Sequence, residues 1–237
     1  MNFIIGLFAK PLGYLLLAIY NIIGNYGIAL TILTVVVKTC LYPLYIKQMK
    51  STMVSAGMQG KVKQIQQKYA NDKDTMNMKL AELYQEEGFN PASGCLPMLI
   101  QMPIIFGLFA LLRTPMAFIE DQNMLFAIHE SFLWITDLSQ PDKWILPILA
   151  GVATYISFSI SQMGSAQANP NMDMSGMMNA MKYLYPIMIF LMGRSFPAGL
   201  ALYWFVGQFL QIFFNMHMNT LRKKMQKEMK KAKGGKR

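Results

Sequence analysis

Charged residues are scarce in this sequence and unevenly placed. Of the 237 residues, only 14% are Asp, Glu, Lys or Arg, whereas 54% are hydrophobic. A soluble domain normally carries about 25% charged residues, so the composition argues against one. The charges that are present gather between positions 47 and 87 and after position 217. Such segregation is typical of a chain that alternates between lipid and water, which indicates an integral membrane protein.

Cysteine and histidine are also rare. The two cysteines, Cys40 and Cys95, lack the close spacing to another Cys or His that a zinc site requires, and they suggest no disulfide framework. The two histidines, His129 and His217, form no HExxH pattern, and no Walker-type glycine loop is present. These absences argue against a zinc-dependent membrane protease and an ATPase. We therefore expect no enzymatic activity, no metal and no cofactor.

Apolar segments, in contrast, are long and numerous. A helix needs about 20 apolar residues to cross about 30 Å of hydrocarbon, where its backbone groups must be satisfied internally. Five segments approach this length, at 27–46, 94–112, 144–163, 183–196 and 198–214. The fourth is short and contains Pro186 and Gly193, and residues 194–199 predict a tight turn after it. The sequence predicts an all-α membrane protein with five transmembrane helices.

The loops differ in charge, which predicts how the chain is oriented. Lys and Arg close to the spans mark the cytoplasmic side. Seven lysines lie between the first two predicted spans, namely Lys47, Lys50, Lys61, Lys63, Lys68, Lys73 and Lys79. The tail after His217 adds nine basic residues against the single Glu228, whereas 114–142 has five acidic residues and no Lys or Arg. We expect the first spanning helix to start outside and the C-terminus to be cytoplasmic.

The first 25 residues are apolar but interrupted. Lys10-Pro11 breaks the run, and Gly6, Lys10 and Gly13 recur at helical spacing beside a wider apolar face. This pattern favours an interfacial amphipathic helix on the outer leaflet. A sixth span or a signal sequence also fits the apolar content, although no convincing cleavage site follows.

Residues 47–91 carry a helical pattern of their own. Two apolar stripes are visible, one formed by Met58, Val62, Ile65 and Tyr69 and the other by Met76, Leu80, Leu83 and Tyr84. Residues 71–74 supply a turn between them, with Asp74 as the expected cap of the second helix and Gly88 as its end. We expect a cytoplasmic helical hairpin; a merely solvated connection is the alternative.

Lys38 is the most informative single residue because it lies deep within the first predicted span. A charge at the centre of a bilayer costs about 2.5 to 3.5 kcal/mol on insertion scales, so it normally faces water or a partner. The alternative is that the side chain extends to the cytoplasmic surface. About 12 Å of helix separates Lys38 from Ile46 at the end of the span, which is long for one lysine. We favour a hydrated recess around a functional cation.

No Asp or Glu lies inside the five predicted spans, so the counter-charge of Lys38 must come from another molecule. Polar residues at membrane depth are expected to line the recess: Thr31, Thr34, Gln101, Ser157, Ser161 and Gln208. The missing acids disfavour a proton-coupled transporter, and a single lysine is poorly suited to a selective channel. A channel or transporter and a membrane-embedded enzyme remain the rival function classes.

Three stretches resemble a known family. They are YGIAL at 26–30 continuing through Lys38 and Pro43, GCLPMLIQMP at 94–103, and FPAGLALYW at 196–204. Together they are similar to the YidC/Oxa/Alb membrane protein insertases, in the short bacterial form without a large extracytoplasmic domain. The resemblance covers nearly the whole chain from Tyr26 to the basic tail.

The resemblance implies that the chain is a membrane protein insertase and chaperone of the bacterial plasma membrane. It implies a five-helix core whose positively charged hydrophilic groove opens to the cytoplasm and the lipid. Lys38 would occupy the place of the groove cation, which is usually arginine; lysine lacks arginine's planar fork. The expected groove residues are Lys38, Gln101, Trp204, Gln208 and Thr34, and those of the hairpin are Lys61, Lys63 and Lys68.

The predicted organisation has three parts. Residues 1–25 form the interfacial helix, 26–216 form the insertase core including the 47–91 hairpin, and 217–237 form the basic cytoplasmic tail. Nascent membrane proteins and the Sec translocon are the expected protein partners. The polybasic tail suits ribosomal RNA or anionic lipids, unless it is only a topology signal, and no DNA partner is expected.

Overall fold

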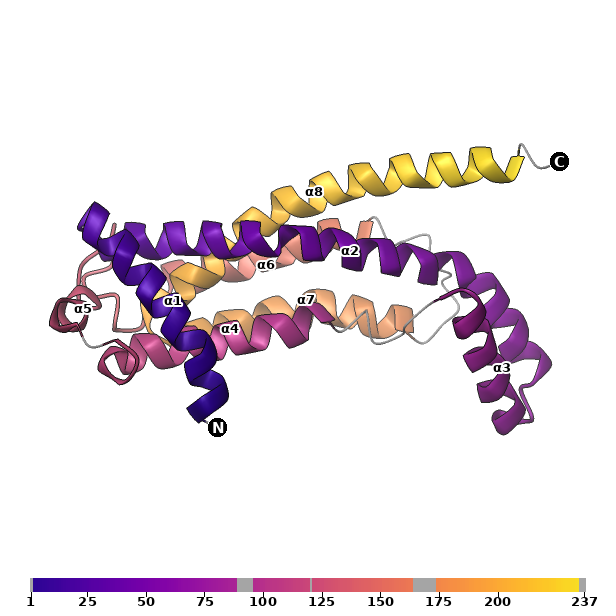
Figure 1. Cartoon of the computed structure of the whole chain (residues 1–237), viewed down its shortest axis with the longest axis horizontal. Helices are drawn as coiled ribbons and strands as arrows, with labels where there is room; N and C mark the ends of the chain where they lie inside the picture. The colour runs from indigo at the N-terminus through magenta and orange to yellow at the C-terminus, as the bar shows by residue number, and fades with distance from the viewer. Residues whose placement is uncertain (1, 89–95, 120, 164–173, 235–237) are drawn as a thin grey trace.

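The computed structural model is predominantly helical in the part of the chain that it describes, which excludes residues 1, 89–95, 120, 164–173 and 235–237. The helices follow one another along the chain in Figure 1 as α1 (Asn2–Ile23), α2 (Tyr26–Lys68), α3 (Lys73–Glu86), α4 (Leu96–Arg113), the 3-10 turn η2 (Pro115–Ala117), α5 (Gln122–Ala127), α6 (Ile145–Met163), α7 (Met174–Gly193) and α8 (Ala198–Gly234). The all-α fold is therefore confirmed.

Helix α2 is unusually long because nothing interrupts it where the predicted span ends. It begins at an Asn25 cap, whose side chain accepts a hydrogen bond from the Ile28 amide at 3.0 Å. Gly24 just before it has φ +67°, a conformation that favours glycine, and so allows the sharp turn from α1 into α2. The same helix then supplies both the first predicted span and the first arm of the hairpin.

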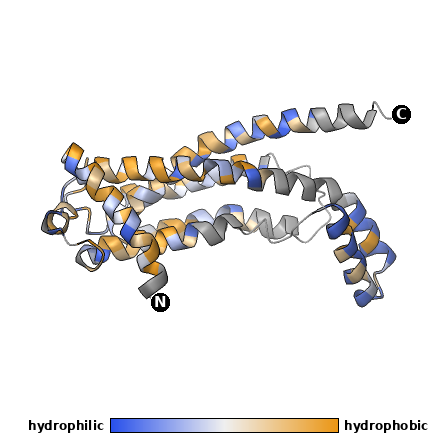
Figure 2. Cartoon of the chain, viewed as in Figure 1, coloured by the Kyte–Doolittle hydropathy of each residue, from blue (hydrophilic) through white to orange (hydrophobic). Residues whose placement is uncertain are grey.

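The hairpin of α2 and α3 projects from one end of the molecule, and its described surface is largely hydrophilic (Figure 2). Val62 and Leu83 are buried, and Lys61 forms an ion pair with Glu87 across the two helices.

The predicted N-terminal cap of α3 was wrong. Asp72, and not Asp74, precedes the helix and accepts from the Thr75 amide at 3.0 Å, because only its backbone lies outside the helix. Gly88 follows the C-cap with φ +62°, as its expected role as the helix end requires.

The remaining helices form an elongated bundle. Helix α6 packs most extensively against α8 and α7, α2 packs along α8, and α1 packs mainly on α4. The shared core lies at the end opposite the hairpin and includes Tyr26, Leu30, Leu108, Leu146 and Tyr203. Interhelical hydrogen bonds fix α8 on α6, since Asn215 Nδ2 donates to the Ser157 carbonyl at 2.9 Å and Asn219 Nδ2 to the Ile160 carbonyl at 2.8 Å.

Three helical segments among the described residues are long and apolar enough to cross a membrane: Ile5–Ile23, Tyr26–Lys47 and Ile145–Gln162. Gln101–Arg113 and Ala180–Gly193 are shorter apolar segments. The predicted spans coincide with helix where the structure describes them, except at Trp144, which precedes α6, and at residues 194–196, which follow α7. The number of spans stays a prediction. Helix α1 is long enough to span and yet runs obliquely to α2 and α4 (Figure 1), so its interfacial position also stays a prediction.

Loops cover the end of the bundle opposite the hairpin, and their carboxylates accept hydrogen bonds from the adjoining helix ends. Glu130 accepts hydrogen bonds from the Tyr20 hydroxyl of α1 and from the Tyr26 amide of α2, the latter at 2.7 Å. Asp142 accepts from the Trp144 and Leu146 amides at 3.0 and 2.9 Å, which satisfies the first turn of α6. These contacts tie α1, α2 and α6 to one loop region.

Candidate functional site

Lys38 lies inside the bundle and does not extend to the surface. Only 6% of the residue is exposed. Its Nζ donates a hydrogen bond to Gln101 Oε1 of α4 at 3.3 Å. Gln101 Nε2 in turn donates to the hydroxyl of Tyr203 in α8 at 3.2 Å. The contacts of the Gln101 side chain therefore link three helices around one cation.

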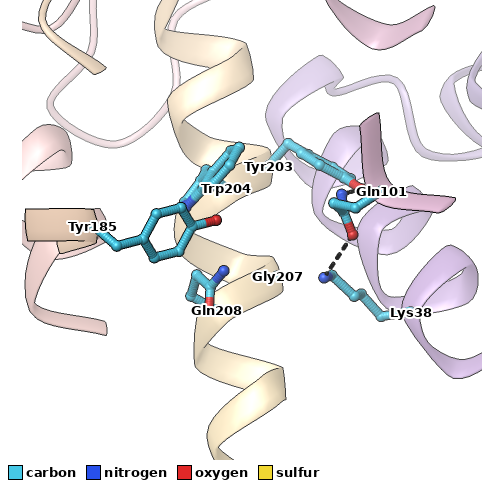
Figure 3. A pocket seen from close by; sticks show the side chains of 7 residues that line it. All are labelled: Lys38, Gln101, Tyr185, Tyr203, Trp204, Gly207 and Gln208. Atoms are coloured by element: carbon cyan, nitrogen blue, oxygen red, sulfur yellow. Dashed lines mark hydrogen bonds between the residues drawn. The ribbon is translucent and has the colours of Figure 1, made fainter. Parts of the chain in front are cut away.

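The ammonium faces a small cavity, which Figure 3 shows from close by. Its volume is about 40 Å³, and it is lined by Lys38, Gln101, Tyr185, Tyr203, Trp204, Gly207 and Gln208. A water molecule needs roughly 10–15 Å³ of such volume, so the cavity has room for roughly three or four. None of these lining residues is acidic. The cavity is therefore hydratable and positively charged.

The cavity has hydrogen-bond donors to spare. Trp204 Nε1 is buried and has no acceptor among the described residues. A lysine ammonium has three donors, and a hydrogen bond to Gln101 occupies one of them. Buried polar groups without partners are rare in folded proteins and call for an explanation such as water or a ligand. An acceptor-rich guest, above all a carboxylate, matches this arrangement chemically.

Gly207 explains how Lys38 fits beside α8. A Cβ atom built on Gly207 would lie 2.9 Å from Lys38 Cε and 3.7 Å from Nζ. Any other residue at this position would therefore push the end of the lysine side chain aside. Glycine lets the two helices approach while the ammonium stays at the cavity.

The structure brings four of the five predicted groove residues together: Lys38, Gln101, Trp204 and Gln208. Thr34 does not line the cavity, because its hydroxyl is buried and donates to the Leu30 carbonyl of its own helix at 2.7 Å. Thr31 is engaged in the same way with Gly27, while Ser157 lies in the contact between α6 and α8. Their roles in binding remain predictions.

Three lining residues were missed from the sequence, namely Tyr185, Tyr203 and Gly207. Tyr203 is inside the 196–204 motif, directly before Trp204, so the motif was the available signal for it. Tyr185 and Gly207 carry no such signal, because an aromatic or a glycine in an apolar helix is ordinarily a packing residue.

The predicted hairpin lysines lie apart from this cavity. Lys61 is bound to Glu87, and the hydrogen bond to that carboxylate raises the pKa of the Lys61 ammonium. Lys68 lies 5.5 Å from the centroid of the Tyr69 ring, and Lys63 is half-buried. The side chains of Lys50 and Met58, and the whole of Cys95, lie outside the described part of the chain. No group of three His, Cys, Asp or Glu suitable for a metal occurs among the described residues.

Comparisons with known proteins identify the family. The profile of the 60Kd inner membrane protein family matches residues 18–229. A protein from Listeria innocua named membrane protein insertase YidC 2 is 37% identical over 203 residues, which cover 83% of this chain and 65% of that protein. A Fusobacterium nucleatum protein named membrane protein insertase YidC is 36% identical over 90% of this chain and 95% of its own length.

A solved structure agrees with these relatives. It is described as an active YidC insertase crystal structure with the first transmembrane domain resolved, and it superposes with a TM-score of 0.58 at 27% identity. The match covers 86% of this chain but 44% of the solved one, so this chain corresponds to less than half of that protein. On the family profile, the relatives and the shared helical architecture, this chain is an all-α integral membrane protein and belongs to the YidC family of membrane protein insertases.

Proposed function

We propose that this chain inserts integral membrane proteins into the bacterial plasma membrane and helps them fold, with the Lys38 cavity as the site that receives acidic client segments. The observation that carries the proposal is a nearly buried cation beside a hydratable cavity with no acidic lining residue. The names of the relatives support the same activity.

The energetics favour a transient carboxylate partner. At an effective dielectric near 20, opposite charges about 4 Å apart gain about 4 kcal/mol. That gain is comparable with the roughly 2.5–3.5 kcal/mol that one Asp costs at the centre of a spanning helix. A single lysine in a hydrated recess is therefore sufficient to lower the barrier for an acidic segment.

A route into lipid is supported by how α4 and α7 are arranged. The two helices contribute Gln101 and Tyr185 to the same cavity, yet they make at most marginal contact with each other among the described residues. Large apolar side chains on both are exposed, including Phe106 on α4 and Leu184 and Ile187 on α7. We propose that the groove opens between these helices, so that an apolar client helix leaves sideways into the bilayer.

The cytoplasmic partners follow from the two hydrophilic projections. The hairpin of α2 and α3 and the C-terminal end of α8 extend away from the rest of the bundle (Figure 1), and the excess of basic residues in both segments supports the cytoplasmic orientation. We propose that the tail contacts the ribosome or anionic lipid and that the Sec translocon is a partner for some clients.

Reconstitution tests the proposal. The full chain is placed in liposomes and supplied, without nucleotide, with a nascent single-span client that has an acidic translocated segment. Protease protection of that segment is the expected result, and empty liposomes are the control. Absence of protection together with measurable solute flux would instead assign the chain to channels or transporters.

A further inference from the structure

A second, larger cavity lies at the end of the bundle opposite the hairpin. Its volume is about 490 Å³, within the range of roughly 300–1,000 Å³ that is usual for small-molecule sites. It is formed by the end of α4, the turn between α7 and α8, and α5 with the loops on either side of it. The lining residues are Phe109, Leu112, Arg113, Pro115, Leu125, Ile128, His129, Ser139, Pro141, Ser195, Phe196 and Pro197. None of these residues belongs to the Lys38 cavity.

The lining of this cavity combines apolar side chains with the Arg113 guanidinium and the hydroxyls of Ser139 and Ser195. Arg113 is exposed at the end of α4, with its guanidinium carbon 5.3 Å from the centroid of the Phe109 ring. No carboxylate lies within 4.0 Å of its nitrogens among the described residues. Asp121, in the segment that follows α4, accepts a hydrogen bond from the Asn123 amide at 2.8 Å. The guanidinium is thus available to an anion.

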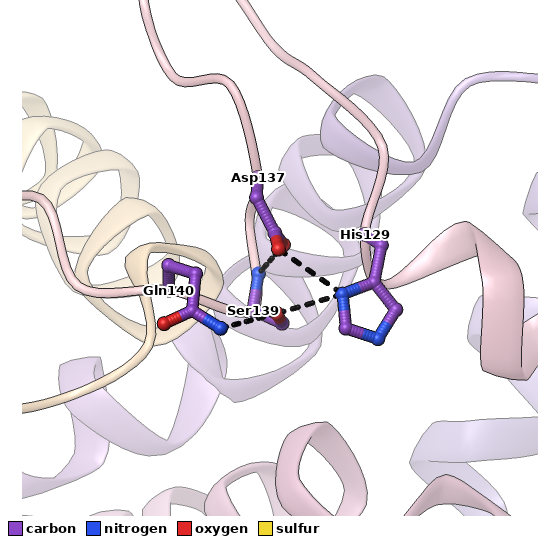
Figure 4. Close-up of polar contacts among 4 residues, drawn as sticks. All are labelled: His129, Asp137, Ser139 and Gln140. Carbon is purple, nitrogen blue, oxygen red and sulfur yellow. Dashed lines mark hydrogen bonds and ion pairs between the residues drawn. The ribbon is translucent and has the colours of Figure 1, made fainter.

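The cluster at the rim is structural and not catalytic (Figure 4). Ser139 Oγ and Asp137 Oδ2 both contact the same nitrogen of His129, Nδ1, at 2.9 and 3.1 Å. A hydrolytic triad needs the serine on one ring nitrogen and the acid on the other. Burial alone would raise the pKa of Asp137, but hydrogen bonds from Ser139 and His129 outweigh it and lower that pKa. Asp137 is therefore committed as an anion to this cluster and not to Arg113.

The cavity lies at the level expected for lipid headgroups. Helices α4 and α7 end beside it and α8 begins there. Trp134 and Trp144 are exposed at the same end of the bundle, and Arg194 stacks on Trp144 at 4.3 Å from the ring centroid. Exposed tryptophans are enriched where a membrane protein crosses the membrane–water interface. A ligand with a polar head and an apolar tail suits this depth.

We propose that this second cavity binds an anionic phospholipid. Its phosphate would pair with Arg113, aided by the hydroxyls of Ser139 and Ser195, while one acyl chain would lie on Phe109, Leu125 and Phe196. An arginine fork matches the geometry of phosphate oxygens. The apolar wall gives a phospholipid an advantage over free phosphate, because acyl methylene groups gain from burial. This inference is independent of the proposed insertase activity.

Native mass spectrometry of the purified full chain in detergent tests the proposal with phosphatidylglycerol and phosphatidylcholine as probes. We expect selective retention of phosphatidylglycerol, and Arg113→Gln should lower that retention about five-fold, the factor expected for one interfacial arginine. Arg113→Lys should retain an intermediate amount. Arg194→Gln is the matched control, because Arg194 is at the same end but lies on Trp144 and does not line the cavity.

Three outcomes would overturn the proposal. One is equal retention of both lipids, and another is wild-type retention by Arg113→Gln. The third is displacement of phosphatidylglycerol by millimolar inorganic phosphate, which would identify a free-anion site instead. Ser195→Asp provides a second variant that keeps Arg113: its added negative charge should also release the anionic lipid, and unchanged retention there would likewise contradict the assignment.

Discussion

The middle of the bundle and its loop-covered end differ in how completely their charged groups are hydrogen-bonded. At the loop-covered end, the Glu130 and Asp142 carboxylates each accept hydrogen bonds from two or more donors of neighbouring segments. In the middle, Lys38 is nearly buried, its ammonium donates a hydrogen bond to the neutral Gln101 side chain, and no acidic residue lines its cavity. Satisfied charges hold a fold together, whereas an incompletely satisfied one is available to a ligand. The contrast separates the residues that stabilise this protein from those that we propose to receive its clients.

Removing the Lys38 charge should give the largest effect on activity. Lys38→Ala is expected to lower insertion of clients with acidic translocated segments by up to roughly 100-fold, because the counter-charge is lost. Lys38→Arg should retain insertion. The thermal unfolding temperature in detergent should fall little or rise, since a buried, incompletely paired cation is itself unfavourable.

The matched control for this prediction is Lys182→Ala. Lys182 is also a helix lysine, but it lies over the Tyr155 and Tyr183 rings and does not line the cavity. Similar insertion by wild type, Lys38→Ala and Lys38→Arg would refute the charge mechanism.

In contrast to Lys38→Ala, Glu130→Gln should lower the stability of the fold. The variant weakens the hydrogen bonds that join α1 and α2 to the loops, and we expect a loss of about 2 kcal/mol in the free energy of unfolding. Denaturant unfolding in detergent measures this change. Glu82→Gln in the exposed hairpin is the control, because its ion pair with Lys79 is solvent-exposed. Equal stability of Glu130→Gln and wild type would break the proposed contrast.

Gly207→Ala should sharpen the contrast by moving the Lys38 ammonium without removing it. The new Cβ would press on Lys38 Cε, the far part of a flexible side chain, so the chain should still fold. We expect insertion of acidic clients to fall roughly five- to ten-fold, since weaker charge pairing of about 1 kcal/mol or slightly more has this effect. Gly151→Ala is the control, because its Cβ would meet only ordinary contacts, the nearest at 3.4 Å. Equal insertion by both variants would show that the position of the ammonium is unimportant.

Asp142→Asn should give the smallest effect, a change in how stability depends on pH under acidic conditions. Burial alone would raise the pKa of this carboxyl, but hydrogen bonds from Trp134 and from the first amides of α6 lower it below its usual value. Its contribution to stability is therefore present above about pH 3.9, the ordinary pKa, and is lost as the pH falls through the lower folded value. Asp142→Asn should lose about 1 kcal/mol at pH 7 and show a smaller further loss between pH 5 and pH 2. Parallel pH profiles for both forms would contradict this account.

Much of the helical architecture follows from the sequence, because long apolar runs in lipid have few alternatives to helix. It was likewise foreseeable that Lys38, Gln101, Trp204 and Gln208 lie together, since a charged side chain at membrane depth needs polar neighbours. Thr34 was a reasonable candidate, but its hydroxyl donates a hydrogen bond to the Leu30 carbonyl of its own helix. Its hydroxyl shows why a polar residue at the right depth need not face the recess.

Other features depend on geometry that the sequence pattern does not encode. Asp72 and Asp74 are both good capping residues, and only the backbone conformation selects Asp72. The oblique course of α1 depends on how Gly107 of α4 admits Phe8 and Ala9, a close approach between distant segments. The role of Gly207 likewise became visible only once α2 and α8 were placed side by side.

The uninterrupted course of α2 places the hairpin and the buried ammonium on one continuous helix, which bends toward α3 at the hairpin end (Figure 1). Thirty residues separate Lys38 from the end of the helix at Lys68, which at 1.5 Å per residue is a path of about 45 Å along the helix axis. A movement of the hairpin would reach the lysine only along the helix backbone between them. Pro43 lies between them and lacks one backbone hydrogen bond, so it is the point where such a movement is either absorbed or passed on.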